Sequence, residues 1–122
     1  MFFNQDRIAN APDNDGNGVS SGHVRVWKYD ETKLKWTQLG QDIDGEALDD
    51  WSGFSVSLSS DGKIVAIGAM NNGATGHVRV WKYDETESWF QLGQDIDGEA
   101  SDDYSGSLVS LSSDGKTVAI GA

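Results

Sequence analysis

The segment Gly22-His23-Val24-Arg25-Val26-Trp27-Lys28-Tyr29-Asp30-Glu31-Thr32 occurs a second time, without a single change, at residues 76–86. Further identity follows this segment in both copies. Residues 38–47 return at 91–100, residues 57–63 at 110–116, and residues 65–69 at 118–122. A repeat of about 50 residues is typical of propeller and solenoid proteins, in which each unit is one small group of secondary-structure elements. The chain therefore carries two copies of one structural unit.

Each unit contains four short segments with the pattern of β-strands, which in the first copy are residues 23–29, 36–43, 54–59 and 64–69. The Asp61-Gly62 pair tolerates the positive φ of a tight hairpin, so we expect the third and fourth segments to pair. The fourth segment is apolar on both faces, which predicts burial on both sides. Its small Ala and Gly residues suit the innermost position near the axis of a propeller.

The segment from Phe54 through Asp61-Gly62 to Gly68-Ala69, followed by Gly76-His77-Val78-Arg79-Val80-Trp81, resembles the FG-GAP repeat of integrin-α-like β-propellers. The resemblance covers nearly the whole chain, twice, although Gly53-Phe54 and Gly106-Ser107 do not keep the Phe-Gly order. It implies an all-β fold of four-stranded antiparallel blades. In that family the turn before the Gly-Ala strand often holds calcium, whereas the corresponding turn at 59–62 has one carboxylate, Asp61.

We expect one repeat domain over residues 1–122, with blade one at about 7–60, beginning at 8–11. Blade two is expected at about 61–113, and an orphan inner strand at about 114–122. Propellers close with about four to eight blades, so two blades and a strand cannot form a ring. Either the chain is a fragment of a larger propeller, or copies of it associate with one another.

The charge and composition exclude several classes of partner and site. The net charge of -11 disfavours nucleic acid and anionic membrane surfaces. The absence of cysteine excludes disulfides and thiol catalysis, and no segment has the apolar length of a signal peptide or a membrane span. These features assign no compartment, and a cell-surface or extracellular location is compatible with a fragment of a longer protein.

Two kinds of acidic loop are candidate calcium sites. The loop with Asp13, Asp15, Asn17 and Ser21 places oxygen ligands at EF-hand-like positions one, three, five and nine, with a Gly at six and no Glu at twelve. The alternative is a polar hairpin. The densest carboxylate cluster is repeated, and a solvated acidic loop is its favoured explanation; it comprises Asp42, Asp44, Glu46, Asp49 and Asp50, and in the second copy Asp95, Asp97, Glu99, Asp102 and Asp103.

Aromatic residues are the candidates for ligand binding. Trp51 follows Asp49-Asp50 and Tyr104 follows Asp102-Asp103, which places an aromatic ring beside carboxylates, as in sites for cations or sugars. The alternative is that both rings only fill the edge of a blade. The tryptophans repeated at 27 and 81, and at 36 and 89, either face a neighbouring blade or stack on sugars.

His23 and His77 occupy the same place in the two copies, so we expect a structural role and no catalytic one. The favoured function is a non-enzymatic module for protein or glycan interaction and scaffolding. The alternatives are a calcium-binding repeat protein and a fragment of a propeller-type hydrolase.

Overall fold

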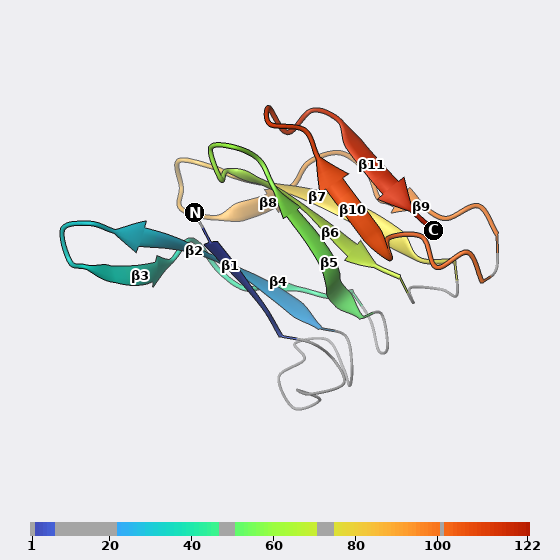
Figure 1. Ribbon diagram of the computed structural model, residues 1–122, viewed down its shortest axis with the longest axis horizontal. Coiled ribbons are helices and arrows are strands. Elements are labelled where there is room, and N and C mark those ends of the chain that lie inside the picture. The colour runs from blue at the N-terminus through green and yellow to red at the C-terminus, as the bar shows by residue number, and fades with distance from the viewer. Residues whose placement is uncertain (1, 7–21, 47–50, 71–74, 101) are drawn as a thin grey trace.

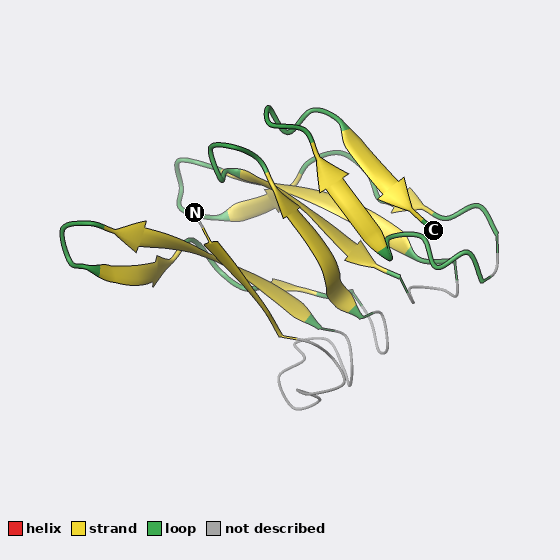
Figure 2. Ribbon diagram, viewed as in Figure 1, coloured by secondary structure: helices red, strands yellow, loops and turns green. Residues whose placement is uncertain are grey.

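The computed structural model describes residues 2–6, 22–46, 51–70, 75–100 and 102–122, and these form three antiparallel sheets with no helix among them (Figures 1 and 2). The first sheet contains β1 (Phe2–Asp6), β2 (His23–Asp30) and β3 (Lys35–Gln38), in that order. The short β4 (Ile43–Asp44) also pairs with β2. The expected all-β fold is therefore confirmed.

The second sheet contains the most strands of the three. Its order is β5 (Ser52–Leu58), β6 (Ile64–Ala69), β7 (His77–Tyr83) and β8 (Trp89–Gln91), and β9 (Ile96–Asp97) also pairs with β7. The third sheet contains only β10 (Leu108–Leu111) and β11 (Val118–Gly121). By the repeat, β2–β4 correspond to β7–β9, and β10–β11 correspond to β5–β6.

The strand pairing corrects the expected division into blades. The expected boundary between 60 and 61 falls inside the hairpin that joins β5 to β6, where Gly62 has a φ of 73°. Residues 118–121 are not an orphan strand, because they pair with β10. The expected start of blade one at 8–11 lies outside the described residues.

The strand β1 occupies a position in the first sheet that the repeat in the sequence does not predict. Phe2 pairs with Trp27 in the first sheet, just as Val65 pairs with the equivalent Trp81 in the second. The strand β1 thus occupies the place of a β6-type strand, although Phe-Phe-Asn-Gln-Asp has no similarity to the sequence of β6.

The predicted second strand of the unit, 36–43, is divided in two. Gly40 adopts a φ of 76°, in the left-handed region that a regular strand cannot include. The Leu39 N–H donates to the Val26 carbonyl oxygen at 2.7 Å, which keeps the interrupted segment on β2. The segments on either side, β3 and β4, both pair with β2.

The core lies in two layers, one on each face of the second sheet. Val65 and Ile67 of β6 pack with Val24, Val26 and other residues of the first sheet. Ala66, the residue between them, joins the layer that includes Val109 and Ile120 of the third sheet. The predicted burial of this strand on both sides is confirmed. Its predicted innermost position is wrong, because β6 lies between β5 and β7 and is not an edge strand.

Gly68 lies against the segment that leads into β10. A Cβ atom at Gly68 would overlap the Gly106 carbonyl oxygen and lie 2.7 Å from the Ser55 Oγ. At the equivalent Gly121 the nearest atom would be the Leu108 Cβ, at 3.3 Å. The two glycines are identical in the repeat but different in their surroundings.

We predict that Gly68→Ala lowers the free energy of unfolding by about 1–3 kcal/mol, because the backbone of a neighbouring sheet must move to admit one methyl group. The matched variant Gly121→Ala should cost clearly less. Urea denaturation of both variants measures the difference. Equal losses would show that Gly68 does not set the spacing of the sheets.

Candidate functional site

The seam between the first and second sheets is built by Trp89 and the turn that interrupts the strand at Gly40. The Trp89 Nε1–H donates to the Leu39 carbonyl oxygen at 2.6 Å. The Gln41 side chain makes two bonds with the Trp89 backbone, donating to its carbonyl oxygen at 2.8 Å and accepting from its N–H at 2.9 Å. A Cβ at Gly40 would lie 2.7 Å from the Trp89 Cδ1, so only glycine fits under the indole. Of the two explanations for the tryptophans, packing on a neighbouring sheet describes Trp89.

The repeat equivalents of these residues are exposed where no described sheet covers them. Trp36 is 46% exposed, whereas its equivalent Trp89 is 3% exposed. Ile96 is 37% exposed, whereas its equivalent Ile43 is 2% exposed. A Cβ at Gly93, the equivalent of Gly40, would have no neighbour within 4 Å among the described residues. The first and second sheets thus each present a half of the seam that they form with one another.

A hollow lies on the second sheet beside β11. Its lining includes Val80, Leu92 and Ile96 from the second sheet and Val118 from β11. No described strand pairs with the far side of β11, whereas its equivalent β6 pairs on that side with β7. The hollow therefore occupies the place that β7-type and β8-type strands would fill in a complete third sheet.

A cluster of carboxylates surrounds His77 at the seam. Its Nδ1 lies 3.4 Å from Glu46 Oε1, 3.8 Å from Asp95 Oδ2 and 4.0 Å from Asp97 Oδ1. The His77 side chain is 1% exposed, and neither ring nitrogen has a hydrogen-bond partner in the described part of the chain. Glu46 comes from the first sheet's side of the seam, so the cluster joins two successive units.

The charges in this cluster act on one another. The Glu46 side chain is 43% exposed, and its partial desolvation raises its pKa; the Arg79 guanidinium opposes this rise, and the nearby Asp95 charge adds to it. Burial also acts to raise the pKa of Asp95, but the hydrogen bond from Gln91 Nε2 at 2.6 Å and the neighbouring His77 hold that pKa below its usual value. Arg79 itself donates to the Asp44 carbonyl oxygen at 3.0 Å across the seam.

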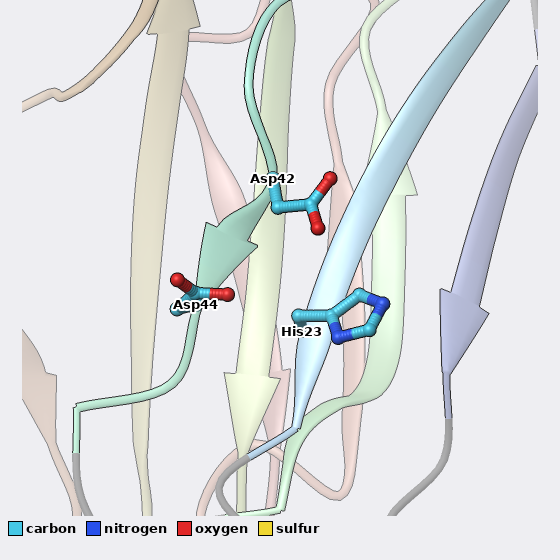
Figure 3. A group of neighbouring side chains, drawn as sticks. All are labelled: His23, Asp42 and Asp44. Carbon is cyan, nitrogen blue, oxygen red and sulfur yellow. The ribbon is translucent and has the colours of Figure 1, made fainter. Parts of the chain in front are cut away.

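The equivalent cluster in the first sheet consists of His23, Asp42 and Asp44 (Figure 3). Figure 3 shows His23 on β2 beside the segment that carries Asp42 and Asp44. Asp42 accepts hydrogen bonds from Arg25 Nε at 3.0 Å and Gln38 Nε2 at 2.7 Å. Burial acts to raise the pKa of Asp42, but these two hydrogen bonds outweigh it and lower that pKa.

The residues of the EF-hand-like loop, Asp13, Asp15, Asn17 and Ser21, lie outside the described residues, as do Asp49 and Asp50. Of the repeated acidic residues, the structure brings Glu46, Asp95 and Asp97 around His77. Asp103 does not join them, and its Oδ2 accepts from the Ala100 N–H at 3.0 Å within its own loop. Asp102 is exposed, with a φ of 67°.

The single carboxylate of the 59–62 turn has a structural role. Asp61 Oδ1 accepts from the Ser59 hydroxyl at 2.8 Å and the Lys63 N–H at 2.9 Å, and this backbone bond is the main cause that lowers the pKa of Asp61. Asp114 repeats the arrangement with Ser112 and Lys116. The carboxylate is thus committed to closing the hairpin.

Trp51 and Tyr104 occupy the same turn in the two copies. Their φ values are 59° and 52°, and their carbonyl oxygens each accept from the N–H three residues later at 3.1 Å. Trp51 stacks on Phe54 with ring centroids 6.3 Å apart, whereas Tyr104 has Ser107 at that place and is exposed.

Comparison with known proteins adds no relative: no family model matches the chain, and no curated protein matches it. In the part of the chain that the structure describes, no helix has the length and apolar character needed to cross a bilayer.

We predict that Asp42→Asn lowers the free energy of unfolding by up to about 1 kcal/mol near pH 7, a modest value because the ion pair is partly exposed. The folded-state pKa of Asp42 is lowered, so its contribution is present above the unfolded pKa of about 3.9 and is lost as pH falls through the folded pKa. Denaturant titrations at neutral and acidic pH should show the difference shrink in acid. A difference independent of pH would contradict this account.

We predict that Trp51→Ala lowers the melting temperature more than Tyr104→Ala does, because Trp51 stacks on Phe54 whereas no described ring stacks on Tyr104, and such a pair contributes about 0.5–1.5 kcal/mol beyond area burial. Thermal unfolding followed by circular dichroism makes the comparison. A glycan panel tested on the Tyr104 variant separates the two explanations of this ring: lost binding with stability kept identifies a ligand site.

Proposed function

We propose that this chain is a non-enzymatic repeat module of the β-propeller type, and that its function is binding, first of all to a second copy of the same repeat. The proposal is based on two open seams, which are the exposed surface at Trp36 on the first sheet and the exposed surface at Leu92, Gly93 and Ile96 on the second sheet. Trp36 is exposed where Trp89 is covered, and Leu92, Gly93 and Ile96 are exposed where Leu39, Gly40 and Ile43 are covered.

The internal seam supplies the template for this contact. In the complex, Trp36 of a second copy lies over Leu92 and Gly93, as Trp89 lies over Leu39 and Gly40 within the chain. Gln94 then bonds to the backbone of the second copy's Trp36, as Gln41 does to that of Trp89. Every side chain needed is present at the same position of the repeat.

The strand edges fit the same arrangement. The strand β2 of the second copy adds to β11, as β7 adds to β6, because β11 and β2 repeat the sequences of β6 and β7. This places β2 over the hollow beside Val118 and completes a four-stranded third sheet. In the second copy β1 leaves β2, so a strand without repeat sequence is replaced by one that has it.

The electrostatic and chemical features support binding over catalysis. Among the described residues, His77 lies beside three carboxylates and has no serine hydroxyl as a hydrogen-bond partner, so this part of the chain does not supply the pairing that activates a nucleophile. We also propose that the chain binds protein or glycan ligands in addition to a second copy. We further propose that it is related to the FG-GAP propellers. The turns at Trp51 and Tyr104 are the surfaces offered to such ligands.

We predict concentration-dependent self-association in analytical sedimentation, because unpaired strand edges and exposed apolar residues favour association. The Ser112 N–H donates to the Thr117 carbonyl oxygen, so by alternation along the ladder the N–H groups of Val118 and Ile120 point to the free edge. Ile120→Pro should therefore abolish association by removing one outward donor while keeping the hydrogen bonds to β10.

The control is Phe90→Ser, which removes an exposed apolar side chain on β8 and leaves both edges intact. It should associate as the parent does. A variant lacking residues 1–6 should associate more strongly, because β2 is then free. A parent chain that stays monomeric at all concentrations, or association insensitive to Ile120→Pro, would refute the proposal.

A further inference from the structure

We propose that Glu46, His77 and Asp95 bind one divalent transition-metal ion, such as Zn²⁺, at the seam between the first and second sheets. All three ligand atoms lie within 4.8 Å of one another. The site is complete within one chain, so it does not depend on self-association.

The buried imidazole is the first argument. A polar side chain that is 99% buried normally has a hydrogen-bond partner, because an unpaired buried polar group costs about 1–3 kcal/mol. His77 has none among the described residues, although its Nδ1 lies 3.4 Å from Glu46 Oε1 and 3.8 Å from Asp95 Oδ2. A metal ion between these atoms gives the nitrogen lone pair a partner.

The distances are the second argument. Metal–ligand bonds of about 2.0–2.1 Å at tetrahedral angles separate two ligand atoms by about 3.3–3.4 Å. The Nδ1 of His77 is 3.4 Å from Glu46 Oε1 and 3.8 Å from Asp95 Oδ2. A small side-chain movement therefore brings the three atoms to the separations of one coordination shell, and the exposed carboxylates leave the ion a route from solvent.

The chemistry of the ligands selects the class of ion. One imidazole nitrogen with two carboxylate oxygens suits Zn²⁺ and its neighbours, whereas Ca²⁺ prefers six to eight oxygen ligands. Gln91 Nε2, which donates to Asp95 Oδ1 at 2.6 Å, orients that carboxylate from behind. Asp97, whose Oδ1 lies 4.0 Å from the same nitrogen, is available as a further oxygen ligand.

A site made in this way links two repeat units. Glu46 follows β4 of the first sheet, while His77 and Asp95 belong to the second. Bound metal should therefore stabilise the seam against separation of the sheets. In the part of the chain that the structure describes, the similar cluster of His23, Asp42 and Asp44 contains no glutamate, so its ligand set is different.

The test is Zn²⁺ binding to the full chain after treatment with a chelator, measured by competition with a fluorescent zinc indicator at a concentration where sedimentation gives the monomer. We expect one strong site per chain, and a rise in melting temperature with Zn²⁺. Both His77→Gln and Glu46→Gln should weaken binding by at least roughly tenfold, since each removes one of three ligands.

The matched control is Glu99→Gln, which removes the same charge at the same position of the repeat and should leave affinity unchanged. The Glu46 side chain is 43% exposed, so we expect Glu46→Gln to fold even if His77→Gln does not. The far-UV spectrum and the melting temperature of Glu46→Gln in chelator verify its folding. Excess Ca²⁺ should not displace Zn²⁺. Absence of strong binding, equal loss in the Glu46 and Glu99 variants, or displacement by Ca²⁺ would each overturn the proposal.

Discussion

The packing of one sheet on the next is the interaction on which the rest of this structure depends. A single sheet has no core of its own, because its apolar residues are buried only where another sheet covers them. Trp89 reaches its deep burial because Leu39, Gly40 and Gln41 of the preceding unit receive it. Trp36, which occupies the equivalent position in the first copy of the repeat, is exposed. In a repeat protein, stability is largely a sum of such nearest-neighbour contacts, so units at an open end are the least stable part.

The sequence predicts the repeat, the all-β class, the paired third and fourth strands and their two-sided burial. It does not predict how strands group into sheets, because a periodic sequence can be divided at any phase with equal internal identity. The grouping is decided by the Asp61-Gly62 hairpin, which holds β5 and β6 in one sheet. The strand β1 could not be predicted from the repeat, since Phe-Phe-Asn-Gln-Asp pairs with β2 without resembling β6.

The cluster at His77 shows the same limit of sequence reasoning for sites. The repeated histidine and acidic residues were visible, but Glu46 is distant from His77 along the chain and reaches it only through sheet stacking. A search within one repeat cannot find this contact, because its members belong to successive units. The useful signal is the repeated Asp-Gly-Glu at the end of each short strand, which in the first copy places Glu46 beside His77 of the second sheet.

Amide hydrogen exchange at the free edge of β11 tests most directly whether the open seams complete one another between copies. In the monomer the outward N–H groups of Val118 and Ile120 have no strand partner in the described part of the chain. The account predicts that these two amides become protected as protein concentration rises. Exchange at one unchanged fast rate, at every concentration up to that of the associated form, would contradict it.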